Sequence, residues 1–138
     1  MSTVQRSVVV IVKPKTKDHF PPDEIISLKF ASVDLDSNET EKEFIKCEAE
    51  IQQRESGMDY KYKNKINVPE DFGEIGAVIV ELQEDVNERF IDSIFIEKQT
   101  PHKLVMFSCK SWVQPRGVIG HRRIFFSTKV GLVSWYIN

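Results

Sequence analysis

The nine residues FSCKSWVQP, positions 107–115, contain the side chain that comes closest to catalytic chemistry. Cys109 could act as a nucleophile if nearby cations such as Lys103 and Lys110 lowered the pKa of its thiol. The alternating pattern, however, places Cys109 in an apolar strand, where burial raises a thiol pKa. We therefore expect an inert core cysteine, with Trp112 on the opposite face of the strand.

The other residue types that commonly carry out chemistry are scattered along the chain. The three histidines, His19, His102 and His121, are too far apart in sequence for a local metal pair such as HExxH. The sequence has no GxSxG motif, no phosphate-binding glycine loop and no dinucleotide-binding fingerprint. An independent small enzyme is therefore the least favoured function.

Two acidic segments contain the oxygen ligands that calcium prefers. Calcium takes six to eight oxygens in relaxed geometry, which loops can supply. The candidate ligands are Asp34, Asp36, Asn38, Glu39, Glu70 and Asp71. Aspartate and asparagine are also good turn formers, and the EF-hand spacing is absent. Both interpretations, a calcium site and simple turns, therefore stay open.

Three large aromatic residues lie at predicted loops. Phe20 precedes two prolines, Phe72 lies within a Pro/Gly turn, and Trp112 is next to the loop at 115–120. Exposed aromatic side chains on loops mark contact surfaces, including membrane interfaces. Each of the three could instead fold back and cap the core, and for each one alone the cap is favoured.

Strand periodicity dominates the elements that must position these residues. The predicted strands are 7–12, 24–35, 59–68, 76–82, 89–97, 103–109 and 122–127. The segment 39–53 fits a helix or a strand, and the strand is favoured. Seven or eight short strands separated by Pro, Gly, Asp and Asn turns predict an antiparallel sandwich or a barrel.

Composition limits the class of protein. The 138 residues are 41% hydrophobic and 29% charged, which predicts one globular domain over 1–138. The net charge of −2 argues against a dedicated nucleic-acid binder. Cys47 and Cys109 are too few for a disulfide-built scaffold, so reduced thiols are expected. The apolar run at 8–12 is too short for a signal peptide or a membrane span, so a cytoplasmic protein is expected.

The segment VMFSCKSWVQP, followed about ten residues later by RRIFFSTK, resembles the end of the N-terminal β-sandwich of plant lipoxygenases, the PLAT or LH2 domain. The residues that carry the match are Phe107, Cys109, Ser111, Trp112, Val113, Pro115, Arg123, Ile124, Phe125 and Phe126. Weaker similarity extends the resemblance over residues 7–129. It implies an all-β, antiparallel β-sandwich of about eight strands.

The resemblance also implies a function without catalysis. In that family the sandwich packs on a larger helical dioxygenase domain, and in related proteins it assists membrane or lipid association, sometimes with calcium in its loops. No counterpart of the family's iron ligands is present up to Asn138. The expected function is a lipid- or membrane-interface binding module. The resemblance also allows a location at the periphery of membranes and a calcium ion that assists binding. The alternative is a protein-interaction module that docks on an enzyme or self-associates.

Overall fold

The computed structural model describes residues 2–15, 19–34, 42–97 and 104–128. Its eight strands are β1 (Thr3–Lys13), β2 (Ile25–Ser32), β3 (Ile45–Ile51), β4 (Tyr60–Pro69), β5 (Ile75–Leu82), β6 (Arg89–Glu97), β7 (Leu104–Val113) and β8 (Arg123–Phe126). A single 3-10 turn, η1 (Glu70–Phe72), connects β4 to β5. The predicted all-β class is confirmed.

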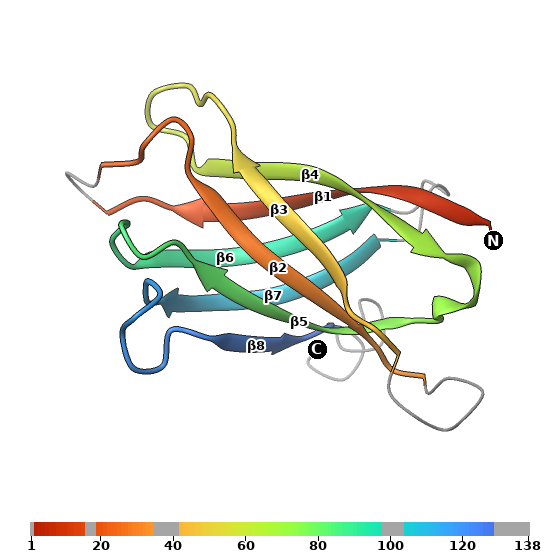
Figure 1. The fold of residues 1–138 in the computed structure, drawn as a ribbon. Coiled ribbons are helices and arrows are strands. Elements are labelled where there is room, and N and C mark those ends of the chain that lie inside the picture. Colours follow the sequence, from red (N-terminus) through yellow and green to blue (C-terminus); the bar gives the residue numbers. More distant parts are fainter. Residues whose placement is uncertain (1, 16–18, 35–41, 98–103, 129–138) are drawn as a thin grey trace, which may run out of the picture.

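The strands form one antiparallel sheet that curls into two layers (Figure 1). Their order is β7-β6-β1-β4-β3-β2-β5-β8, and the layers cross where β3 meets β4 through only two residue pairs. The two edge strands approach each other through a bridge between Met106 and Thr128. The sheet is therefore a sandwich that is nearly closed into a barrel.

Alternation of apolar and polar residues builds the core between the layers. In β4, Tyr62, Ile66 and Val68 are buried, whereas Lys63 and Lys65 are exposed. This pattern arises because neighbouring residues of a strand point to opposite faces. The segment 45–51 follows the same rule, since Cys47 and Ala49 of β3 are buried, and its predicted strand is confirmed.

A bulge in β7 shapes the segment that carries the sequence signature. Ser108 pairs with Ser93 and Ser111 pairs with Ile91, so Cys109 and Lys110 together oppose one residue of β6. Lys110 takes a positive φ of 45°, which is rare outside glycine. The bulge lets β7 continue to Val113, which is further than predicted. Cys109 is buried and Trp112 is exposed on the other face, as expected.

The antiparallel order gives the sandwich two ends, which carry different loops (Figure 1). The end we call the Trp112 end carries the connections β1–β2, β3–β4, β5–β6 and β7–β8. The opposite end, called the Phe72 end, carries the connections β2–β3, β4–β5 and β6–β7 and the start of β1.

Candidate functional site

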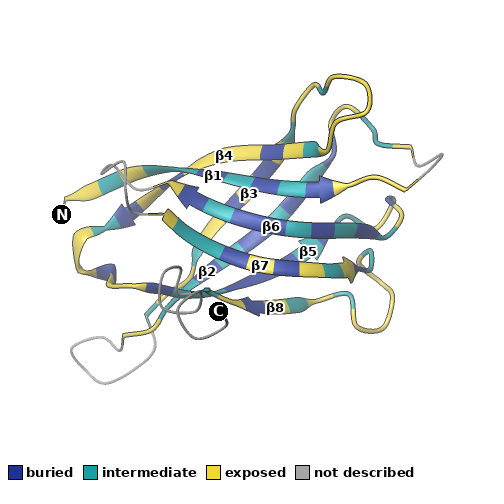
Figure 2. Cartoon of the chain, turned by 180° about the vertical axis from the view of Figure 1, so that it is seen from behind, coloured by how far each residue is buried: buried dark blue, intermediate teal, exposed yellow. Residues whose placement is uncertain are grey.

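The β7–β8 connection projects two aliphatic side chains from the Trp112 end. Val118 is 44% exposed and Ile119 is 99% exposed. Figure 2 shows much of the β7–β8 connection in the colour of exposed residues. Backbone hydrogen bonds from Val118 to Pro115 and from His121 to Val118 close two successive turns. Gly117 and Gly120 take positive φ values of 96° and 77°, which these turns require. The loop therefore presents Val118 and Ile119, called the aliphatic tip, to solvent.

Three arginines surround the base of this loop, and we call them the basic collar. They are Arg116, Arg122 and Arg123. The Glu81 carboxylate of β5 lies 3.6 Å from Arg116 Nε, 3.7 Å from His121 Nε2 and 3.8 Å from Arg122 Nε. Three guanidinium charges against the one carboxylate give the collar and Glu81 together a charge of +2, and two exposed acids of the β5–β6 connection, Glu84 and Asp85, lie at the same end.

Trp112 lies next to the collar with one side packed and the other open. Its ring makes an edge contact with Phe90 at a centroid distance of 5.3 Å, and Lys15 Nζ lies 4.6 Å from the ring centroid. The side chain remains 37% exposed. Lys15 also binds Glu88 at 2.7 Å, and this hydrogen bond, helped by one from Gln114, lowers the pKa of the Glu88 carboxyl. Trp112 is therefore held in place at the surface.

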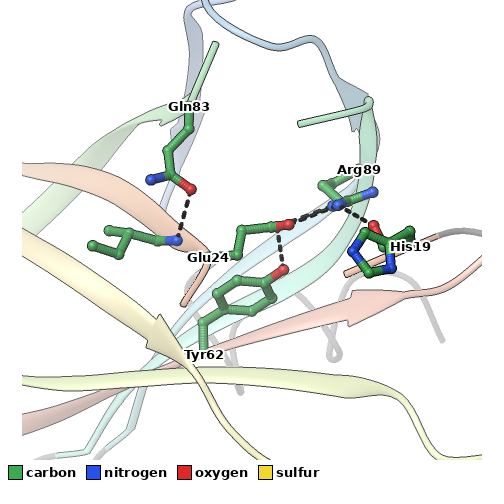
Figure 3. Close-up of polar contacts among 6 residues, drawn as sticks. His19, Glu24, Tyr62, Gln83 and Arg89 are labelled. Atoms are coloured by element: carbon green, nitrogen blue, oxygen red, sulfur yellow. Dashed lines mark hydrogen bonds and ion pairs between the residues drawn. The ribbon is translucent and has the colours of Figure 1, made fainter. Parts of the chain in front are cut away.

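A buried polar cluster underlies the Trp112 end (Figure 3). The Arg89 guanidinium donates two hydrogen bonds to the Glu24 carboxylate, from Nη2 at 2.6 Å and from Nε at 3.0 Å. Both side chains are fully buried. Tyr62 donates its hydroxyl to the same carboxylate, and Arg89 donates to the His19 carbonyl at 3.0 Å. Burial, helped by the hydrogen bond to Glu24, raises the pKa of Tyr62 well above its ordinary value. The hydroxyl therefore stays a donor.

This cluster holds Phe20 against the sandwich. The Phe20 ring stacks on Tyr60 at 3.8 Å, and the Arg89 guanidinium lies 3.8 Å from its centroid. Phe20 is half-buried against the core, which is the capping alternative rather than a free contact residue. Sequence reasoning missed Glu24 and Arg89. The signal was present, because each charged residue adjoins or begins an apolar strand.

Phe72, at the opposite end, is a core residue. It is only 4% exposed, because η1 turns its ring inward against the sandwich. This position agrees with the favoured alternative, in which the ring caps the core, and not with a contact role for Phe72. Of the three predicted contact aromatics, Trp112 alone keeps a substantially exposed ring.

The two acidic segments do meet at the Phe72 end, as far as the structure describes them. Val33 donates its backbone N–H to the Glu74 carbonyl at 2.9 Å, and the Ser32 hydroxyl donates to the Phe72 carbonyl. The Asp34 carboxylate occupies the space beside Gly73 that a Cβ would fill. Asp36, Asn38 and Glu39 lie outside the described residues. Sequence reasoning singled out both segments but did not predict that they meet.

Lys42 places a positive charge at the second of these segments. Its ammonium donates hydrogen bonds to the carbonyls of Asp71 and, at 3.0 Å, of Phe72. Within residues 2–15, 19–34, 42–97 and 104–128, no three His, Cys, Asp or Glu side chains are grouped to hold a metal ion. Asp34, Glu70 and Asp71, the candidate ligands that the structure describes, are therefore not grouped as a metal site of three such side chains.

The two thiols are free and buried. Burial raises the pKa of Cys109 to about 12 and that of Cys47 to about 11. Both thiols therefore stay protonated near neutral pH, which makes them poor nucleophiles. The expectation that Cys109 is an inert core residue agrees with this environment.

A second apolar surface lies on the outer face of β5 and β8. Ile124 is 54% exposed and Phe126 is 73% exposed, and they pair with Ile79 and Ala77 of β5. Ile79 is 8% exposed although it does not belong to the core cluster between the layers. We call Ile79, Ile124 and Phe126 the outer patch. Sequence reasoning recognised these strands but not which face Phe126 would take.

A groove of about 630 Å³ beside β4 is lined largely by polar and charged side chains, including Arg54, Asp59 and Lys61. This lining does not suit an acyl chain, since lipid-binding pockets are mostly apolar. In addition, the described part of the chain contains no helix with the length and apolarity needed to cross a bilayer.

No family model matches the chain. Curated proteins with similar sequences are lipoxygenases. A chloroplastic lipoxygenase 2 of Tanacetum cinerariifolium is 38% identical over 109 residues, which are 78% of this chain and 11% of that protein. A chloroplastic lipoxygenase 2 of Arabidopsis thaliana is 38% identical over 76 residues, which are 55% of this chain and 8% of that protein. The chain thus spans about a tenth of the relatives it matches.

Solved lipoxygenase structures share the fold. One, in complex with arachidonate, has a TM-score of 0.58 and 14% identity, and the match covers 96% of this chain and 19% of that one. Coral 8R-lipoxygenase, described as activated by calcium via a C2-like domain, has a TM-score of 0.55 and 15% identity over 90% of this chain and 17% of its own. The 138 residues therefore correspond to a small part of these enzymes and not to their catalytic domain. The chain is homologous to the N-terminal part of plant lipoxygenases and has the β-sandwich fold of a PLAT/LH2 domain.

Proposed function

We propose that this chain is a non-catalytic lipid- or membrane-interface binding module. The observation that carries the proposal is the aliphatic tip, where Ile119 is 99% exposed at the end of a loop that its own turns hold in shape. A fully exposed isoleucine costs free energy in water that insertion into a lipid surface would recover. Trp112, next to the same loop, suits the headgroup level, which tryptophan prefers.

The magnitude of the effect makes the proposal testable. Moving one isoleucine side chain fully out of water contributes about 1.5–3 kcal/mol, which is at least a ten-fold change in partitioning. The Ile119→Ser variant should therefore bind phosphatidylcholine vesicles at least about ten-fold more weakly in a co-sedimentation assay. Since Ile119 touches little of the protein, the denaturant midpoint of unfolding should be the same for the variant and the unmodified chain.

Val33→Ser is the matched control, because Val33 is an aliphatic residue that is 57% exposed at the Phe72 end. Its vesicle binding should equal that of the unmodified chain. If the unmodified chain stays in the supernatant, or if both variants lose binding equally, the proposal for this loop is wrong.

The dependence of membrane binding on calcium is a separate part of the proposal. The C2-like, calcium-activated domain of coral 8R-lipoxygenase supports it, whereas the Lys42 ammonium, which already donates to the carbonyls of Asp71 and Phe72, argues against it here. We therefore propose that contact through the Trp112 end proceeds without calcium. Pelleting with vesicles should be equal in calcium and in chelator. If pelleting requires calcium, the acidic segments of the Phe72 end and not the Trp112 end make the membrane contact.

A second candidate function is a protein-interaction module, and the outer patch favours it. Exposed aliphatic and aromatic residues side by side on an edge strand, here Ile124 and Phe126 of β8, are typical of a surface that another protein covers. If the chain self-associates through this patch, light scattering after size exclusion should detect a dimer that Phe126→Asp converts to a monomer. Vesicle binding should be unchanged by that substitution, which separates the two candidates.

The absence of catalysis is also part of the proposal. Purified chain incubated with linoleate should consume no oxygen above the protein-free control. The expected location is the periphery of a membrane. Because relatives are named as chloroplastic, the chloroplast is the first compartment to compare with the cytoplasm, with a fluorescent fusion as the measurement.

A further inference from the structure

We propose that the basic collar selects membranes with anionic phospholipid headgroups, so that the aliphatic tip inserts preferentially where lipid phosphates and carboxylates are dense. This inference rests on the proposed membrane function and adds its ligand chemistry. The collar lies on both sides of the tip in sequence, Arg116 before it and Arg122 and Arg123 after it. A bilayer that accepts the tip therefore meets the arginines at headgroup depth.

The sharing of Glu81 leaves the collar able to bind anions. A single carboxylate faces Arg116, Arg122 and His121 at 3.6–3.8 Å, distances longer than those of a charge-assisted hydrogen bond. Exposed ion pairs of this kind contribute little free energy, and the Arg116 and Arg122 side chains are about half exposed. Guanidinium groups can therefore turn from Glu81 to phosphate, which they bind with two parallel hydrogen bonds.

Arg123 ties the collar to Trp112. Its Nη1 donates to the Trp112 carbonyl at 2.8 Å, and its guanidinium carbon lies 5.3 Å from the Phe125 ring centroid. This contact keeps a positive charge beside the tryptophan. The Trp112 end thus combines an apolar tip, an interfacial aromatic and fixed positive charge without needing a metal ion to offset repulsion.

Vesicle co-sedimentation separates the collar from the tip. Vesicles of phosphatidylcholine alone are compared with vesicles of equal parts phosphatidylcholine and phosphatidylserine, at fixed ionic strength. The Arg116→Gln/Arg122→Gln variant should lose about five-fold in binding per charge on the mixed vesicles. On phosphatidylcholine vesicles it should bind like the unmodified chain.

Glu81→Gln provides the opposite change. Removing the shared carboxylate raises the collar charge from +2 to +3, so binding to mixed vesicles should increase about five-fold. Lys65→Gln, an exposed lysine of β4, is the matched charge control and should change binding little. Inorganic phosphate should compete no better than chloride of equal ionic strength, because the ligand is a lipid surface rather than the free ion.

The outcomes separate the two proposals. If the unmodified chain binds neither vesicle, the membrane function is wrong and the collar has no role. If it binds both vesicles equally, or if Lys65→Gln has the same effect as the arginine changes, the membrane function stands and the collar proposal is overturned. Specific competition by inorganic phosphate would also overturn the lipid headgroup as the ligand.

Discussion

The two ends of the sandwich contain similar kinds of residue but arrange them in opposite ways. At the Phe72 end, acidic residues lie outside, an aromatic ring is buried, and Lys42 supplies a cation to backbone carbonyls. At the Trp112 end, the acid Glu24 is buried with Arg89, whereas aliphatic side chains and arginines lie outside. At the end that is most acidic in sequence, a lysine thus donates to the turn that buries Phe72, and at the other end the exposed apolar tip lies between the arginines of the basic collar.

The difference between the two ends indicates which of them suits contact with a lipid surface. Acidic loops approach a bilayer only with a cation to offset repulsion, and the described part of the Phe72 end offers Lys42 in that position. In the function we propose, the Trp112 end meets the same surface directly. The buried Glu24–Arg89 pair and the Phe20 cap hold the strands β1, β2, β4 and β6 together at this end.

Breaking the buried pair should have the largest effect on stability. Glu24→Gln leaves the Arg89 guanidinium in the interior without its carboxylate, which should lower the free energy of unfolding by about 3–5 kcal/mol. Denaturant unfolding followed by tryptophan fluorescence measures this change. Glu84→Gln, at an exposed position of the same end, is the control and should stay within about 0.5 kcal/mol. A similar, small loss for both would mean that the pair does not support this end.

Removing the buried aromatic ring of the Phe72 end should have the next largest effect. Phe72→Ala should lower the free energy of unfolding by about 3 kcal/mol, because it removes core contacts and leaves a cavity. Binding to vesicles, measured on the folded fraction, should be unchanged. Reduced vesicle binding by folded Phe72→Ala protein would indicate that this end takes part in lipid contact.

The Lys42 contact should contribute less, since the side chain is partly exposed. Lys42→Gln should lower the free energy of unfolding by about 1 kcal/mol, below the roughly 1.5–3 kcal/mol typical of hydrogen bonds to charged groups. Lys46→Gln, an exposed lysine of β3, is the matched control. Calorimetric titration should also detect no calcium binding to the unmodified chain. Saturable binding that Lys42→Gln does not alter would contradict the role given to Lys42.

The smallest stability effect is expected for Trp112. Trp112→Leu removes the edge contact with Phe90 and the cation–π contact with Lys15, which should cost about 0.5–1.5 kcal/mol. Vesicle binding should fall at the same time, because the interfacial aromatic is lost. Unchanged binding in the folded variant would restrict the lipid contact to Val118 and Ile119.

Much of the fold was predictable from the sequence because strand alternation is local. The run at 59–68 indicates a strand with one dry face, and Tyr62 and Ile66 are buried as predicted. The β7 signature also predicts opposite faces for Cys109 and Trp112, and the bulge at Lys110 preserves them. The bulge itself was not predictable, since it depends on the register with β6.

The candidate site was predictable only in part. Trp112 was named from its place beside a loop, whereas the arginines and Ile119 of the same loop were not. Phe72 and Phe20 have the same sequence signal as Trp112, yet the core covers the first ring and Tyr60 and Arg89 hold the second. Whether a loop aromatic faces solvent depends on what folds over it, which adjacent residues do not specify.

The sequence by itself determined the strands, the all-β class, the inert environment expected for Cys109 and the resemblance to the PLAT/LH2 domain. These features follow from side-chain type and a period of two, which act between neighbours in the chain. The tertiary structure alone decided that Glu24 meets Arg89, that Lys42 lies over the Phe72 turn and that the arginines of the β7–β8 loop share Glu81. Those contacts join residues far apart in sequence, so no local pattern could predict them.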